Sequence, residues 1–222
     1  MDLAAYLDHT NLKADARRED ITRLCEEAAH YEMAAVCIHP VRVEWAARLL
    51  KGSGVKVCTV AGFPLGADRS DAKLYTIERA WHDGAAEVDM VINIGAVKDG
   101  DYRQVEQEIR RAVALKEQTP FLLKVIVETA LLAAEELAAL TKLVADCGAD
   151  FIKTSTGFAP RGVSLQDISI ITAARPEGLR IKASGGIKDL DFALRLIEAG
   201  ADRIGSSSAA FLMEEYIKRG GR

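Results

Sequence analysis

The sequence has little of what marks a secreted, membrane or nucleic-acid-binding protein. Its 222 residues include only 4 cysteines and 5 prolines, and its formal net charge is −4. The cysteines form no C-x-x-C pair, which is typical of reduced thiols rather than of disulfides. No apolar run approaches the ~18 residues of a membrane span, no secretory signal pattern is visible, and no basic cluster indicates nucleic acid or a membrane surface. We therefore expect a cytoplasmic protein with small-molecule partners and with neither a nucleic-acid nor a membrane partner.

Short runs rich in Val and Ile alternate with amphipathic stretches along the chain, and eight of these runs are predicted strands. They lie near Tyr6–Thr10, Ala34–His39, Val55–Ala61, Glu87–Asn93, Phe121–Val127, Asp150–Ser155, Arg180–Ser184 and Asp202–Ser206. Strands that alternate with helices indicate βα units around a parallel sheet. We predict an α/β fold, a (β/α)8 TIM barrel, with one domain over residues 1–222.

A short repeat ends three of the predicted helices, with glycine at Gly84, Gly148 and Gly200. Glycine accepts the left-handed conformation that commonly ends a helix. Five residues beyond these glycines stand Asp89, Lys153 and Gly205. The equal spacing predicts a similar depth in the barrel, toward the C-terminal strand ends where TIM-barrel enzymes keep their active sites.

Strand parity separates the lumen from the helix layer, because alternate residues face opposite sides of a sheet. In the fourth predicted strand, the apolar set is Val88, Met90 and Ile92, which leaves the intervening residues for the lumen. The same reasoning on four strands predicts that four ionisable side chains meet inside the barrel. They are Asp89, Lys124, Lys153 and Lys182.

Charges inside a packed barrel are costly unless they are paired, so these lysines need an explanation. A lone strand lysine is most often structural, and Lys124 could simply neutralise Asp8 or Asp89. Lys153 and Lys182, however, are predicted at equivalent depth on adjacent strands, which places like charges together. A neighbouring cation and a desolvated pocket favour a neutral amine, which can form a Schiff base with a carbonyl. We assign Lys153 as the nucleophile, Lys182 as the neighbouring cation and Asp89 as a proton relay.

Small residues follow the last three predicted strands, at Gly157, Gly185, Gly186, Ser207 and Ser208. Glycine lets backbone N–H groups approach a ligand, and a helix N-terminus favours an anion. Each position alone is consistent with a turn or a helix cap. Together, after the strands where TIM barrels bind phosphate, they predict a phosphate subsite.

We predict no metal site. His39, Cys37 and Cys58 stand at strand ends and could imitate metal ligands, but their spacing matches no zinc pattern.

In six stretches the sequence resembles the deoxyribose-phosphate aldolases, a family of class I aldolases. The stretches are Asp8–Thr10, Val60–Ala67, Glu87–Ala96, Leu123–Thr129, Phe151–Phe158 and Ile181–Ile187. The resemblance implies reversible cleavage of 2-deoxy-D-ribose 5-phosphate into acetaldehyde and D-glyceraldehyde 3-phosphate, in deoxynucleoside catabolism.

The resemblance also implies which residues act and what else takes part. Lys153 would form the Schiff base, Asp89 and Lys182 would transfer protons, and neither a metal nor an organic cofactor would be needed. A homodimer is the assembly that it implies. We expect Asp8 and Lys124 as a supporting pair in the lumen, with Thr156 as a further supporting residue.

Three departures from the family pattern leave substrate preference and turnover open. They are His39, Ala209 and the final residues 219–222, which lack a terminal tyrosine. Two alternatives remain: a Schiff-base barrel aldolase for another phosphosugar, and a non-catalytic barrel that binds a phosphorylated metabolite. The second would have no reason to keep Lys153, Lys182 and Asp89 together.

Overall fold

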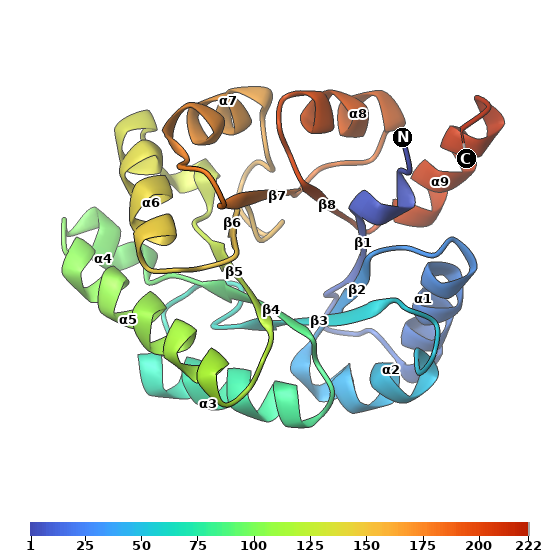
Figure 1. The fold of residues 1–222 in the computed structure, drawn as a ribbon, viewed down its shortest axis with the longest axis horizontal. Coiled ribbons are helices and arrows are strands. Elements are labelled where there is room, and N and C mark those ends of the chain that lie inside the picture. Colours follow the sequence, from blue (N-terminus) through green and yellow to red (C-terminus); the bar gives the residue numbers. More distant parts are fainter. Residues whose placement is uncertain (222) are drawn as a thin grey trace.

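The eight Val- and Ile-rich runs form parallel strands that pair in chain order and close into a barrel in the computed structural model, which describes residues 1–221 (Figure 1). The strands are β1 (Leu7–Asn11), β2 (Ala35–Ile38), β3 (Lys56–Ala61), β4 (Glu87–Val91), β5 (Leu122–Ile126), β6 (Phe151–Lys153), β7 (Arg180–Ser184) and β8 (Arg203–Ser206). Each overlaps its predicted range, so the predicted TIM barrel is confirmed. Arg222, the last residue of the predicted domain, lies outside the described residues.

Helices connect the strands and cover the outside of the barrel (Figure 1). In residues 1–221 the α-helices are α1 (Arg18–His30), α2 (Val43–Leu49), α3 (Ser70–His82), α4 (Ile94–Lys98), α5 (Tyr102–Ala114), α6 (Ala134–Asp146), α7 (Leu165–Ala174), α8 (Leu190–Glu198) and α9 (Ala209–Lys218). Short 3-10 helices are η1 (Ala4–Tyr6), η2 (Pro40–Arg42), η3 (Leu115–Glu117) and η4 (Thr129–Leu131). Across the described part of the chain, no helix is both long and apolar enough to cross a membrane.

The predicted parity of the strands is confirmed by two separate apolar clusters. Val88 and Met90 of β4 are fully buried in the large cluster between the sheet and the helices, as is Ile152 of β6. A smaller cluster occupies the lumen and includes Cys37 and Cys58. Strands of a parallel barrel are covered on both faces, so stability comes from the outer layer while the lumen can hold polar groups.

The three predicted helix-ending glycines have left-handed backbones. The φ angles are 106° at Gly84, 85° at Gly148 and 114° at Gly200. Such angles are strained for residues with a side chain, so these glycines allow α3, α6 and α8 to end and the chain to enter the next strand.

A buried lysine fastens the loop after β3 to the next βα unit. Lys73 of α3 is 1% exposed, and its Nζ lies 2.8 Å from Oε1 of Glu108 in α5. The same Nζ donates to the carbonyl oxygens of Gly66 at 2.8 Å and Val91 at 2.9 Å. Glu108 Oε2 accepts the backbone N–H of Asn93 at 3.1 Å. The ion pair therefore joins α3, the end of β4 and α5.

Replacing Lys73 by Met should lower the free energy of unfolding by about 3–5 kcal/mol, because Glu108 would keep a buried carboxylate without its cation. Urea unfolding measures the loss. Lys98→Met is the matched control, since Lys98 pairs with Glu136 at 2.6 Å but its side chain is 45% exposed. That exposed pair should contribute at most about 1 kcal/mol. Equal losses in the two variants would contradict the role given to the buried pair.

Candidate active site

Four strands bring three lysines onto one aspartate inside the barrel. Oδ2 of Asp89 on β4 lies 2.7 Å from Lys153 Nζ on β6 and 2.7 Å from Lys182 Nζ on β7. Its Oδ1 lies 3.0 Å from Lys124 Nζ on β5. Lys153 and Lys182 are register partners across β6 and β7, as their predicted equivalent depth requires. The predicted convergence of four ionisable groups is confirmed, while their chemical roles remain predictions.

Asp89 is held ionised by its neighbours. Burial raises its pKa, but the charges of Lys124, Lys153 and Lys182 outweigh burial and hold the pKa well below its usual value. The carboxylate is fully buried and accepts hydrogen bonds from all three ammonium groups. It therefore acts as the shared counter-ion of the lumen.

Lys182 is anchored as a cation between two carboxylates. Its Nζ lies 2.5 Å from Asp8 Oδ2, an ion pair rather than an aligned hydrogen bond, and 2.7 Å from Asp89 Oδ2. Burial lowers the pKa of Lys182, but Asp8 and Asp89 outweigh burial and raise the pKa well above its usual value. A positively charged lysine thus stands next to Lys153, on the neighbouring strand.

Asp8 and Lys124 both lie in the lumen, but they do not form the expected pair within the described residues. Lys124 Nζ lies 2.5 Å from Glu87 Oε2 and 3.0 Å from Asp89 Oδ1. Asp8 instead contacts Lys182 and Arg203, whose Nη1 lies 2.7 Å from Asp8 Oδ1. Parity assigned the correct face to Lys124, but neither parity nor the family resemblance gave the partners of Asp8 and Lys124 across the barrel.

In the part of the chain that the structure describes, the linked ionic groups of the lumen comprise three acids and four bases. The acids are Asp8, Glu87 and Asp89, and the bases are Lys124, Lys153, Lys182 and Arg203. Within residues 1–221, three of the bases contact two carboxylates each, whereas Lys153 contacts only that of Asp89. The charges of the set balance when the amine of Lys153 is neutral.

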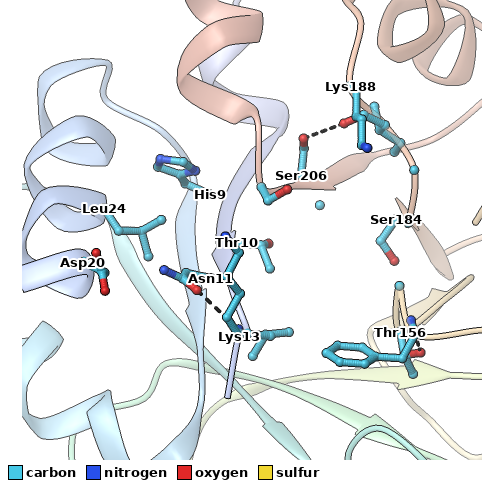
Figure 2. Close-up of a pocket in the computed structure, with 18 of the residues that line it drawn as sticks. His9, Thr10, Asn11, Lys13, Asp20, Leu24, Thr156, Ser184, Lys188 and Ser206 are labelled. Atoms are coloured by element: carbon cyan, nitrogen blue, oxygen red, sulfur yellow. Dashed lines mark hydrogen bonds between the residues drawn. The ribbon is translucent and has the colours of Figure 1, made fainter. Parts of the chain in front are cut away.

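A cavity of about 580 Å3 opens above these charges, at the C-terminal ends of the strands (Figure 2). Lys153 lines it, whereas Asp89 and Lys182 are fully buried and are not among its lining residues. A carbonyl ligand in the cavity would therefore meet the amine of Lys153. A volume of this order is typical of pockets for small molecules.

Four of the five predicted phosphate residues line the cavity: Gly157, Gly185, Gly186 and Ser207. Ser208 is not among the lining residues; it precedes α9, and its N–H donates to Ser206 Oγ at 2.9 Å. The loops carrying these glycines are closely packed, because a Cβ on Gly162 would lie 1.9 Å from the carbonyl oxygen of Gly185. This close approach holds the loop after β6 against the end of β7.

Several lining residues were not predicted from the sequence. Lys188 and Lys13 add positive charge to the cavity wall, and a signal for Lys188 was available in its place directly after Gly186 and Ile187. Figure 2 shows His9, Leu24 and Asp20 on one side of the cavity, with Ser206, Ser184 and Thr156 on the other. His9 Nε2 lies 2.6 Å from Oε2 of Glu27 in α1.

Two thiols and a carboxylate form a cluster with possible metal ligands in the lumen. Atoms of Cys37, Cys58 and Asp89 lie within 4.8 Å of one another. However, Lys124 Nζ lies 3.4 Å from Cys58 Sγ and 3.0 Å from Asp89 Oδ1, and a second cation there would be repelled. Burial also raises the pKa of the Cys58 thiol well above its usual value, which disfavours the thiolate that metals bind. His39 is not in the cluster; its Nε2 lies 3.0 Å from the carbonyl oxygen of Leu12.

Comparison with known proteins gives one consistent result. The model of the DeoC/LacD family aldolases matches residues 3–213. The deoxyribose-phosphate aldolase of Aciduliprofundum boonei is 47% identical over 213 residues, which are 96% of this chain and 96% of the relative. That of a Geobacillus species is 47% identical over 212 residues, 96% of this chain and 95% of the relative. A solved deoxyribose phosphate aldolase from Aeropyrum pernix, described as tetrameric, superposes with a TM-score of 0.91 at 32% identity and covers 98% of this chain and 92% of its own.

Acid should remove the stabilisation that Asp8 contributes. Burial raises the pKa of Asp8, but Lys182 and Arg203 outweigh burial and lower it from 3.8 to about 2. A carboxyl group whose pKa is lower in the folded protein stabilises the fold above its unfolded pKa, and this stabilisation is lost as pH falls through the folded pKa. The loss for Asp8 should be about 2 kcal/mol between about pH 4 and pH 2.

Asp8→Asn tests this expectation by urea unfolding across that pH range. At neutral pH the variant should be less stable than the unmutated protein, because Lys182 and Arg203 lose a carboxylate. The difference should narrow as the pH falls, since protonated Asp8 resembles Asn in charge. A difference that stays constant or widens toward pH 2 would contradict the low pKa.

Proposed function

Because the chain belongs to the DeoC/LacD family of aldolases, we propose that its cavity reversibly cleaves 2-deoxy-D-ribose 5-phosphate to acetaldehyde and D-glyceraldehyde 3-phosphate through a Schiff base on Lys153. One observation supports this proposal above the others. Lys153 lines the cavity. Below Lys153, the buried carboxylate of Asp89 contacts both Lys153 and the buried cation Lys182. The reaction belongs to the breakdown of deoxynucleosides.

In the cleavage direction, the neutral amine of Lys153 attacks the aldehyde carbon of the open-chain sugar. Loss of water gives an iminium ion. A base then removes the proton of the C3 hydroxyl, the C2–C3 bond breaks, and its electrons flow into the iminium to form an enamine. D-glyceraldehyde 3-phosphate leaves, the enamine is protonated at C2, and water releases acetaldehyde from Lys153.

We further propose that Asp89 and Lys182 move the protons of these steps. Asp89 Oδ2 lies 2.7 Å from Lys153 Nζ and 2.7 Å from Lys182 Nζ, so one carboxylate oxygen links the two lysines. Lys182 supplies a proton donor, and Asp89 an acceptor. Asp8, Lys124 and Thr156 act in support: Asp8 and Lys124 by pairing with Lys182 and Asp89, and Thr156 in the cavity wall.

The part of the cavity wall that follows β6, β7 and β8 would hold the phosphate. Gly157, Gly185, Gly186 and Ser207 offer backbone and hydroxyl groups, and Lys188 adds a cation. Ser208 would contribute through the start of α9. A phosphate held there fixes the distance of the reacting carbons from Lys153, which turns a bimolecular encounter in the synthetic direction into an oriented one.

The proposed chemistry needs neither a metal nor an organic cofactor, because the iminium itself accepts the electrons of the breaking bond. We further propose a single aldolase domain over residues 1–222 and a homo-oligomer, with the homodimer as our expectation. A cytoplasmic location is also proposed. It is supported by the four cysteines, which are buried and free.

The substrate is tested by comparing retro-aldol rates on a panel of sugar phosphates. We expect kcat/KM for 2-deoxy-D-ribose 5-phosphate to exceed that for D-ribose 5-phosphate by at least roughly tenfold. Release of the aldehyde products, coupled to a dehydrogenase, measures the rates. If another phosphosugar is cleaved faster, the chain is a Schiff-base aldolase of different specificity, and phosphate binding without turnover would support a non-catalytic barrel.

Borohydride reduction in the presence of acetaldehyde should leave an ethyl group on Lys153, located by peptide mass spectrometry. Lys153→Arg should abolish the adduct and lower kcat by roughly 10⁴-fold or more. Lys182→Met should still give an adduct on Lys153, with slower turnover. Lys142→Arg, at an exposed lysine of α6, is the control and should change neither result. An adduct on Lys182, or none, would overturn the assignment.

A further inference from the structure

Glu128 is a buried acid that the proposed mechanism does not use. It follows β5, precedes η4, and is 2% exposed. Its backbone is left-handed, with φ 57° and ψ 72°, which is rare for a residue with a side chain. Among residues 1–221 only one other non-glycine residue has a positive φ, the exposed Glu32 at 54°. Strained backbone of this kind persists where the surroundings impose it, and it is common at ligand sites.

The carboxylate of Glu128 holds the chain directly after β6. Its Oε2 accepts the backbone N–H of Thr156 at 3.0 Å and also the Thr156 hydroxyl. Thr156 Oγ1 in turn accepts the backbone N–H of Phe158 at 3.1 Å. The N–H groups of Thr156 and Phe158 are therefore used inside this turn. Gly157 lies between them and lines the cavity, and no hydrogen bond within the described chain uses its N–H.

The next residue, Thr129, holds the far end of the same loop. Its hydroxyl donates to Asp167 Oδ2 at 2.9 Å, close to the start of α7. Arg161 donates to the Thr129 carbonyl oxygen at 3.1 Å and to Asp167 Oδ2 at 2.6 Å. The corner after β5 thus fixes both ends of the segment from Thr156 to Asp167. This segment carries Gly157 and packs on Gly185 through Gly162.

We propose that Glu128 is a positioning residue for the phosphate group of the substrate. By holding Thr156, and through it Phe158, Glu128 presents the N–H of Gly157 to the cavity. Glu128 would thereby set the preference for phosphorylated over unphosphorylated sugars, without touching the substrate. The second carboxylate oxygen, Oε1, is buried without a hydrogen-bond partner in the described residues. Thr156 is therefore held by Oε2. The inference rests on the proposed function.

Two variants of Glu128 separate the effect of its hydrogen bonds to Thr156 from the effect of its charge. Glu128→Gly removes the carboxylate at a backbone angle that glycine adopts without strain, so the chain should still fold. Glu128→Gln keeps a carbonyl oxygen that can accept both groups of Thr156. Glu32→Gly is the matched control, because it makes the same change at a left-handed but exposed glutamate.

The readout is the ratio of kcat/KM for 2-deoxyribose 5-phosphate to kcat/KM for 2-deoxyribose. Glu128→Gly should lower this ratio about tenfold, which corresponds to about 1.4 kcal/mol of transition-state binding. It should leave kcat/KM for the unphosphorylated sugar nearly unchanged. Glu128→Gln and Glu32→Gly should keep the ratio of the unmutated protein. Equal losses on both sugars, or a Glu128→Gln variant as impaired as Glu128→Gly, would overturn the proposal.

Calorimetric titration with inorganic phosphate tests the same role without turnover. Glu128→Gly should bind phosphate about tenfold more weakly than the unmutated protein and Glu32→Gly. Unchanged affinity, or no phosphate binding by any of the three, would overturn the proposal. If the unmutated protein cleaves neither sugar, the proposed function fails, but a phosphate affinity that depends on Glu128 would still support the positioning role.

Discussion

The carboxylate of Asp89 is the group on which the lumen depends, because three ammonium groups lie within 3.0 Å of it. Without that negative charge, Lys124, Lys153 and Lys182 would face one another in a buried space where repulsion is weakly screened. The three lysines come from three successive strands, and Asp89 from a fourth. One carboxylate therefore links the side chains of half the barrel. Buried ion pairs seldom add net stability, so this arrangement is better explained by chemistry than by folding.

The fold separates stability from chemistry by strand parity. Residues such as Val88 and Met90 pack beneath the helices, whereas Asp89 between them faces the lumen. The outer layer buries the apolar surface that holds the barrel closed. The lumen can then keep a set of charges that would destabilise a smaller protein. The buried Lys73–Glu108 pair serves a different purpose, because it lies outside the lumen and fastens a loop.

Strand order, parity and the four converging groups could be predicted from the sequence, since they follow from periodicity and from the rule that barrel sites lie at C-terminal strand ends. The partners of Asp8 and Lys124 could not, because parity gives a face but not which long side chains meet across a closed barrel. The five-residue spacing also singled out Gly205 but predicted no role for it. In the structure a Cβ there would lie 3.1 Å from Lys182 Cε, so the glycine leaves room for that lysine.

Loop residues were the least predictable part of the site. Glu128 lies in a stretch that the family resemblance covers, but nothing in its local sequence marks a left-handed backbone, which is normally the property of glycine. Ser208 precedes α9 as its N-cap and is not among the residues that line the cavity, which its position after β8 did not reveal. Both outcomes depend on how a loop packs on its neighbours, as Gly162 does on Gly185.

The charges of the lumen also favour Lys153 over Lys182 as the proposed site of the covalent intermediate. Lys182 is fixed between Asp8 and Asp89, and withdrawing it would leave both carboxylates with fewer cations in a buried space. Among the described residues, Lys153 has one carboxylate partner, and it faces the cavity. An iminium on Lys153 keeps the positive charge of the ammonium, so its attraction to Asp89 is retained. When the enamine forms, that nitrogen becomes neutral, and the remaining three bases balance the three acids of the lumen. The same set of charges therefore accommodates both intermediates without rearrangement of Lys182.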